Sequence, residues 1–386
     1  MDWLDILIEH RDKIAELGKT VSDAMEGIKK PKPRIYAPIE RGSKPRIYAP
    51  IVGTPKIDIV IPHRGGFFVK GRPTVGLYLT LLSCEHLLKN SGYDWKYFIV
   101  SNGNSKSAGD ERDSRELAFD YARNTGHLEK IFDVEEGLMP FAARNLGANA
   151  GTAELLVFLD DHVNVHEGFF SGIIETFNTT NAASVRGITF VFYTSVGRDI
   201  PRFFVIFDLD HPFWGFIRTS QFGLPSKPYR IVSSGHGAFA VRRSVWQDVG
   251  GYWDGLVGFS CEEMEFDLRL ALMDHEIVFN PKVSHWHNMD EPKGYSRALK
   301  AENIETMCAV ANIIGGPEYA SRVIRNVRLS TFVPGMREWV EEWVEECLAA
   351  AIQKSDSYAR HFASKRKRSL EEQIAKFKRE GVMSIR

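Results

Sequence analysis

Long apolar runs and clustered cysteines are both missing from this 386-residue sequence. No stretch approaches the roughly 18 to 20 apolar residues that a membrane-spanning helix needs, and the acidic start does not resemble a signal peptide. The cysteines lie far apart, without the spacing of a zinc finger or a disulfide scaffold; they are Cys84, Cys261, Cys308 and Cys347. These absences predict a cytoplasmic protein with reduced thiols, and they leave a peripheral association with a membrane open.

A large excess of charge of either sign is missing as well. The formal net charge is −1, so no overall basic field indicates a nucleic-acid partner. Apolar residues make up 44% and charged residues 26% of the chain, which is typical of a soluble globular protein. The length allows one large domain or two ordinary ones with a substantial core.

Residues 1–30 have the pattern of one amphipathic helix. Leu7, Ile14, Val21 and Ile28 recur every seven residues, which predicts an apolar seam that needs a partner. The seam could pack on the globular body of the same chain or form a short coiled coil that makes a homo-oligomer. The sequence leaves both open.

Residues 31–56 are rich in proline, lysine and arginine and contain a duplication. The octapeptide Lys-Pro-Arg-Ile-Tyr-Ala-Pro-Ile occurs at 32–39 and again at 44–51. Proline removes backbone donors and excludes a helix, so we expect an extended linker. The two copies could be docking strands or a duplicated spacer.

From residue 57 onward, strand-like and helix-like segments alternate. The expected strands are 57–62, 95–100, 130–133, 155–159, 183–192, 233–241 and 277–279, and the expected helices between them are 74–89, 115–125, 244–249 and 262–270. This order predicts an α/β domain with a mainly parallel sheet flanked by helices. Residues 293–386 are typical of further helices, one of them basic through residues 365–368, and the aromatic residues 203–222 are interpreted as core rather than as an acceptor groove.

An apolar run ends in Asp160, Asp161 and His162, at the carboxyl end of an expected parallel strand. Ligands of open α/β sheets gather at that end. Side chains at i and i+2 of an extended chain point to the same side. Asp160 and His162 are therefore candidate ligands of one divalent ion, and Asp161 is expected to face the other way.

Four segments occur in an informative order: Gly-Leu-Met-Pro-Phe-Ala-Ala-Arg-Asn-Leu-Gly-Ala at 137–148, Phe-Leu-Asp-Asp-His at 158–162, Ser-Gly-His-Gly-Ala-Phe-Ala-Val at 234–241 and Gly-Gly-Tyr-Trp-Asp-Gly-Leu at 250–256. Together they resemble the GT-A fold of nucleotide-sugar glycosyltransferases, in particular family 2 and, through the Asp-x-His form, the polypeptide N-acetylgalactosaminyltransferases. The resemblance implies a Rossmann-like catalytic domain over residues 57–292 with helical segments added at both ends. It also implies transfer of a sugar from a nucleotide-diphosphate donor, with a UDP-sugar as first choice, to an acceptor hydroxyl.

Such a reaction expels a diphosphate, whose negative charge a divalent cation can offset. Asp160 and His162 would bind that cation. The resemblance adds His285 as third ligand, with His287 as a close rival. Imidazole ligands favour Mn²⁺ over Mg²⁺.

The resemblance also implies a donor site. The residues expected against the nucleotide-sugar are Pro62, His63, Arg64, Asn102, Arg144, Asn145, Asp161, Gly235, His236 and Gly237. Arg144 suits a phosphate but could instead cap its helix. Asn102 stands where the family usually has an acidic turn, so bases other than uracil stay open.

Glu262 and Glu263 match the acidic pair of inverting family members. Glu263 is the expected general base and Glu262 a contact with the sugar or the acceptor. The retaining N-acetylgalactosaminyltransferases resemble Gly-Gly-Glu-Asn here, so we favour inversion; a solvated helix start is the alternative. Two other functions stay open, a nucleotidyltransferase and a non-catalytic sugar-binding protein, and the acceptor could be a glycan, a lipid carrier, a protein or a modified nucleic acid.

Overall fold

The computed structural model describes residues 46–63, 68–69, 72–73, 76–102, 109–135, 138–193, 198–202, 227–235, 237–257, 262–289, 301–329 and 337–380. Several predictions fall outside these residues. They concern the amphipathic segment 1–30, the first octapeptide copy, Arg64, His236 and the aromatic residues 203–222.

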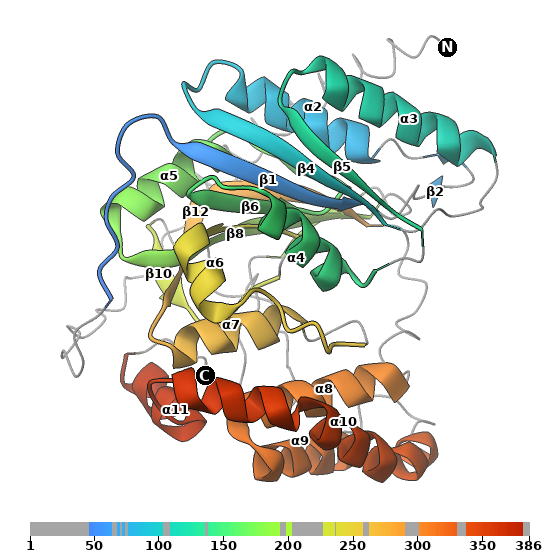
Figure 1. Ribbon diagram of the computed structural model, residues 1–386, viewed down its shortest axis with the longest axis vertical. Helices are drawn as coiled ribbons and strands as arrows, with labels where there is room; N and C mark the ends of the chain where they lie inside the picture. The colour runs from blue at the N-terminus through green and yellow to red at the C-terminus, as the bar shows by residue number, and fades with distance from the viewer. Residues whose placement is uncertain are drawn as a thin grey trace.

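One ten-stranded sheet organises the domain, in the order β10-β12-β8-β11-β6-β1-β4-β5, with β7 paired to β12 and β9 to β8 (Figure 1). Its strands are β1 (Lys56–His63), β4 (Asp94–Asn102), β5 (Leu128–Val134), β6 (Leu155–Leu159), β7 (Val163–Val165), β8 (Ala182–Tyr193), β9 (Arg198–Arg202), β10 (Tyr229–Ile231), β11 (Ala238–Arg242) and β12 (Glu276–Met289). A separate two-stranded sheet pairs β2 (Phe68–Val69) with β3 (Arg72–Pro73).

The first half of the sheet is parallel and the second half is mixed. Strands β6, β1, β4 and β5 run parallel to one another. Strand β11 lies antiparallel between β6 and β8, and β12 is parallel to β8 but antiparallel to β10 and β7. The predicted α/β class is confirmed, and the parallel arrangement holds from β6 to β5.

Helices cover both faces of the sheet (Figure 1). The described helices are α2 (Gly76–Leu88), α3 (Gly109–Asn124), α4 (Pro140–Ala150), α5 (Phe169–Thr179), α6 (Arg243–Val249), α7 (Glu262–Leu272), α8 (Ala301–Gly315), α9 (Pro317–Leu329), α10 (Arg337–Lys365) and α11 (Leu370–Arg379). Alternate residues of each central strand serve the two faces: Ile59 and Val157 join the core under α2, α3 and α5, and Val60 and Phe158 join the core over α4, α6 and α7. Strands buried on both faces are apolar along their length, which is why β6 could be recognised.

The C-terminal helices pack on the side of α7 that faces away from the sheet (Figure 1). They extend the same apolar core: Cys308 of α8 and Phe362 of α10 belong to it. Tyr358 of α10 stacks on Trp253, with ring centroids 5.7 Å apart. None of the described helices is long and apolar enough to cross a membrane.

The basic stretch at 365–368 differs from the prediction of a continuous helix. Helix α10 ends at Lys365, and the chain turns before α11. Two of the basic side chains contact the rest of the domain: Arg366 donates to the Ile314 carbonyl at 3.3 Å, and Arg368 pairs with Asp274. These long-range contacts favour a turn over another helical turn.

Residues 46–51, the described part of the second octapeptide copy, dock on the domain. The Tyr48 hydroxyl bonds His275 Nδ1, and His275 Nε2 lies 3.1 Å from the Asp248 carboxylate, which also pairs with Arg46. Burial, helped by the charge of Arg46, lowers the pKa of His275 from 6.5 to about 4. His275 is therefore neutral in the folded protein at pH 7.

Folding stability should decrease as the pH is lowered, because His275 is held neutral in the folded protein. The unfolded chain takes up this proton near pH 6.5 and the folded chain only near pH 4, so stability present above pH 6.5 is lost as the pH falls toward 4. Between pH 7 and pH 5 we expect the free energy of unfolding, measured with urea, to drop by about 1 to 2 kcal/mol from this group. His275→Gln keeps a donor and an acceptor but does not titrate, and its loss should be smaller by that amount. Equal losses in both proteins would contradict this role.

Candidate donor and metal site

The candidate site forms where β6 ends. All five residues of β6 are buried, and the backbone N–H of Asp160 donates to the carbonyl of Gly237 at 2.8 Å, which fixes the point at which the chain leaves the sheet. Beyond that point Asp160 and His162 are partly exposed, whereas Asp161 is buried. The chain turns here, because the Val163 N–H donates to the Asp160 carbonyl at 3.3 Å, so the extended backbone expected through His162 ends with β6.

Asp160, His162 and His287 come together at this edge. One ligand atom from each lies within 4.8 Å of the other two, and no other group of three His, Cys, Asp or Glu side chains among the described residues could hold a metal ion in this way. His287 Nε2 is 3.2 Å from Asp160 Oδ2, and the rings of His162 and His287 have centroids 4.4 Å apart. A carboxylate oxygen and two imidazole nitrogens suit a transition-metal ion such as Mn²⁺.

Strand register explains why His287, not the expected His285, reaches the cluster. Strand β12 continues through both histidines and pairs with β7, so that His287 lies opposite Val163, next to His162, and His285 opposite Val165. His285 is buried deeper, beside Phe169, and neither of its ring nitrogens has a hydrogen-bond partner among the described residues. Burial holds the pKa of His285 well below its usual value.

Arg144 of α4 contacts the cluster through Asp160. Its side chain is 4% exposed, and Nη2 donates to Asp160 Oδ1 at 2.6 Å. Burial by itself would raise the pKa of Asp160, but Arg144 and His287 together lower it, so the carboxylate is ionised. Burial likewise acts to lower the pKa of Arg144, and Tyr252 and Asp160 outweigh it and raise that pKa.

Asp161 contacts two histidines, its chain neighbour His162 and His63 of β1, so its carboxylate does not face away from His162 as expected. Its carboxylate oxygens lie 2.6 Å from His63 Nδ1 and 2.7 Å from His162 Nδ1. Burial would raise the pKa of Asp161, but these two contacts lower it to about 2. With Nδ1 of His162 bonded to Asp161, the nitrogen that would coordinate a cation is Nε2, the arrangement in which a carboxylate orients a metal-binding imidazole.

Two asparagines that were expected to contact the donor instead hold the backbone of other segments in place. The Asn145 side chain donates to the Tyr252 carbonyl at 2.9 Å and accepts from the Tyr252 N–H at 3.0 Å. Asn102 makes the same paired contact with the backbone of Leu138. Each amide therefore uses both its polar ends on the protein and contributes to the site through the turn that it positions.

The acidic residues that start α7 differ in their surroundings. Glu262 is 4% exposed and its charge acts on Arg144 and Tyr252, whereas Glu263 is partly exposed. Glu265 pairs with Arg269 four residues on, and both are fully buried, with Arg269 Nη2 2.7 Å from Glu265 Oε2. Glu263 is thus the acid of this group with access to an incoming molecule.

The remaining expected residues lie at the same edge of the sheet. Pro62 is partly exposed near the end of β1. A Cβ at Gly235 would meet nothing within 4 Å, but one at Gly237 would lie 2.6 Å from His287 Cδ2. The absence of a side chain at Gly237 therefore makes room for His287, a role that the glycine-rich pattern did not identify.

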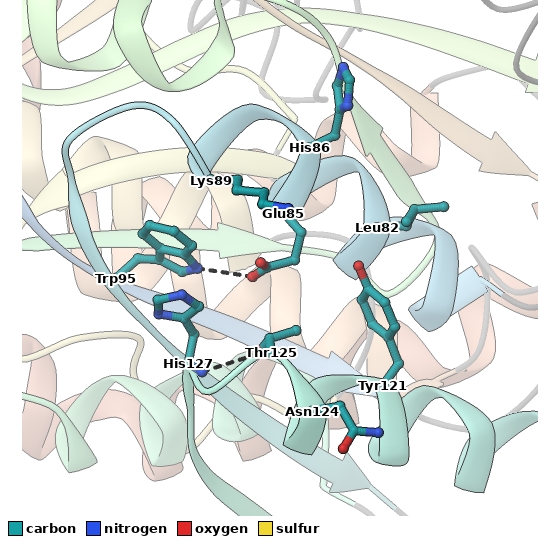
Figure 2. A pocket seen from close by; sticks show the side chains of 9 residues that line it. All are labelled: Leu82, Glu85, His86, Lys89, Trp95, Tyr121, Asn124, Thr125 and His127. Carbon is teal, nitrogen blue, oxygen red and sulfur yellow. Dashed lines mark hydrogen bonds between the residues drawn. The ribbon is translucent and has the colours of Figure 1, made fainter.

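A separate cavity of about 490 Å³ lies between α2 and α3 (Figure 2). Glu85 faces it and accepts hydrogen bonds from Trp95 Nε1 at 3.1 Å and from the Tyr97 hydroxyl at 2.8 Å. Trp95 lies near the amino end of β4, whereas the candidate site lies at the carboxyl ends of the parallel strands. None of the residues expected in the donor or metal site lines this cavity.

Comparison with known proteins identifies the domain. Residues 78–250 match the family model described as glycosyl transferase family 2. The chain contains a glycosyltransferase family 2 domain. The resemblance inferred from the four motifs is thereby confirmed.

Curated relatives and a solved structure agree with this domain. Polypeptide N-acetylgalactosaminyltransferase 8 of Drosophila melanogaster is 28% identical over 158 residues, which are 39% of this chain and 26% of that protein. Polypeptide N-acetylgalactosaminyltransferase 12 of Mus musculus is 26% identical over 176 residues, 44% of this chain and 30% of that protein. The match therefore spans less than a third of the length of either relative.

The structural comparison confirms the GT-A fold. A crystal structure of GalNAc-T7 with UDP, GalNAc and Mn²⁺ superposes with a TM-score of 0.56 at 15% sequence identity, covering 76% of this chain and 55% of that one. The coverage extends well beyond the 173 residues, 78–250, that match the family model. The fold is thus shared by more of the chain than the family model matches.

Gly237→Ala should weaken divalent-cation binding, because a methyl group there would collide with the His287 ring. We expect the Mn²⁺ dissociation constant, measured by calorimetry on the full chain, to rise at least about tenfold, as for other disturbed metal ligands. Gly235→Ala is the matched control, since its methyl group meets open space. Equal Mn²⁺ affinity of the two variants would contradict the placement of His287.

Proposed function

We propose that the family 2 domain is a metal-dependent glycosyltransferase that moves a sugar from a nucleoside-diphosphate donor to an acceptor hydroxyl. The observation that carries this proposal is the meeting of Asp160, His162 and His287 at the carboxyl end of β6. The GalNAc-T7 structure contains UDP, GalNAc and Mn²⁺, which supports a UDP-sugar as donor and Mn²⁺ as the ion.

The cluster fits a bound cation in its chemistry and its surroundings. Asp160, His162 and His287 would hold the ion, which would supply positive charge against the departing diphosphate. Arg144 orients Asp160, and Asp161 orients His162. Such supporting contacts fix the direction of each ligand and raise its affinity for metal.

Glu263 fits the role of general base better than Glu262. A base must reach the hydroxyl of an acceptor that enters from solvent, and Glu263 is partly exposed at the start of α7, whereas Glu262 is buried. In an inverting displacement Glu263 takes the proton of the acceptor hydroxyl. The acceptor oxygen bonds the anomeric carbon, and the diphosphate leaves from the opposite side. Glu262 then acts through its negative charge, which stabilises the charged form of Arg144, and does not contact the acceptor.

Glu263→Gln should stop transfer and preserve donor binding, because the amide cannot accept the proton. We expect the rate of UDP release from the matching UDP-sugar, with Mn²⁺ and acceptor, to fall about 100-fold or more. The thermal shift produced by the same donor with Mn²⁺ should stay at the wild-type value. Glu129→Gln, an exposed glutamate on β5, is the control and should leave both readings unchanged.

The same assay separates the competing functions. Undiminished transfer by Glu263→Gln would remove this residue from the base role. Release of pyrophosphate from a nucleoside triphosphate, with no UDP release from any nucleotide-sugar, would indicate a nucleotidyltransferase instead. Donor binding without transfer or hydrolysis in the wild type would indicate a sugar-binding protein.

A further inference from the structure

The docked part of the second octapeptide copy is held mainly by its backbone. Asn178 and Asn181 accept from the backbone N–H groups of Ile51 and Tyr48, at 2.7 and 3.2 Å. Arg242 Nη1 donates to the Ala49 carbonyl at 3.0 Å, and Asn181 donates to the carbonyl of Arg46. We define the octapeptide groove as the residues that contact the backbone or the side chains of residues 46–51. It comprises Asn178, Asn181, Arg242, Asp248 and His275.

Side chains add sequence selectivity to the groove. The Tyr48 ring stacks on His275 with centroids 6.2 Å apart. The Arg242 guanidinium lies 5.1 Å from the centroid of the Tyr48 ring. Arg46 pairs with Asp248. Ile51 is 8% exposed, whereas Ile47 is 87% exposed and takes no part.

Every one of these contacts comes from a residue inside the duplicated octapeptide. The first copy carries the same side chains at the same spacing: Arg34, Tyr36, Ala37 and Ile39 correspond to Arg46, Tyr48, Ala49 and Ile51. The next residue, Val52, is 83% exposed. The groove therefore recognises a sequence that the chain contains twice.

Chain connectivity distinguishes the copies only weakly. With the second copy docked, residues 52–55 connect it to β1; with the first copy docked, residues 40–55 would do so. Closing the longer loop lowers occupancy about eightfold if the closure probability falls with the 3/2 power of loop length. Such a factor is small beside the loss of the Tyr48 ring, which is partly buried against His275 and Arg242.

We infer that the octapeptide groove binds either copy of the octapeptide of its own chain, so that residues 32–39 exchange with residues 44–51. The second copy predominates by about eightfold. The exchange changes the connection between residues 1–30 and the domain, from residues 31–43 when the second copy is docked to residue 31 alone when the first is docked. The duplication thus sets two lengths for the tether of the N-terminal segment.

Hydrogen exchange with mass spectrometry on the full chain tests this inference, because peptides that extend beyond the octapeptides distinguish the two copies. In the wild type we expect slow exchange at Tyr48 and Ile51. In Tyr48→Ala the second copy loses its ring contacts, and exchange at Tyr36 and Ile39 should slow by at least about threefold relative to the wild type. Ile47→Ala changes an exposed residue of the same copy and should leave both peptides as in the wild type.

A second substitution ties the protection to the groove. Adding Asn181→Ala to Tyr48→Ala removes a backbone partner of either copy and should return exchange at Tyr36 to its wild-type rate. Unchanged exchange at Tyr36 and Ile39 in Tyr48→Ala would overturn the inference. Protection there that grows with protein concentration would also overturn it, because a second chain would then be the source of the bound octapeptide.

Discussion

One partly buried ionic contact, between Asp160 and Arg144, determines the form of the candidate site. A charged carboxylate is costly to bury unless it is paired, and Arg144 at 2.6 Å and His287 at 3.2 Å supply that pairing. The backbone of Asp160 is fixed to Gly237 as well. Helix α4 and strands β6 and β12, with the residue before β11, therefore meet at one side chain, and displacement of any of them would disturb the others.

Three further buried pairs fix the chain around this point. Asp58 binds Arg243 at 2.5 Å, and Asp267 binds Arg186 at 2.5 Å. A third pair, Glu265 with Arg269, reaches the turn after α6, where Arg269 donates to the Gly251 carbonyl at 2.5 Å. Loops that carry the candidate site residues are then held by side chains with little freedom, which favours a site formed before the substrate binds.

The sequence predicted what depends on local order and missed what depends on register. Asp160 and His162 could be predicted because they directly follow a buried apolar strand, although the chain there turns instead of staying extended. His287 was only a rival because its position is set by the pairing of β12 with β7, and the expected strand was too short to include it. The contact of Asn145 with Tyr252 joins residues 107 positions apart, which no local pattern encodes. The four motifs still indicated the family, since they report the order of the strand ends rather than the contacts between them.

The central claim is that Asp160, His162 and His287 hold a divalent ion, and pulsed electron paramagnetic resonance of the Mn²⁺-loaded protein tests it most directly. Nitrogen couplings of two imidazole ligands are predicted for the wild type and for His285→Gln, and those of one for His287→Gln. No nitrogen coupling in the wild type, or the loss of a ligand in His285→Gln but not in His287→Gln, would contradict this account.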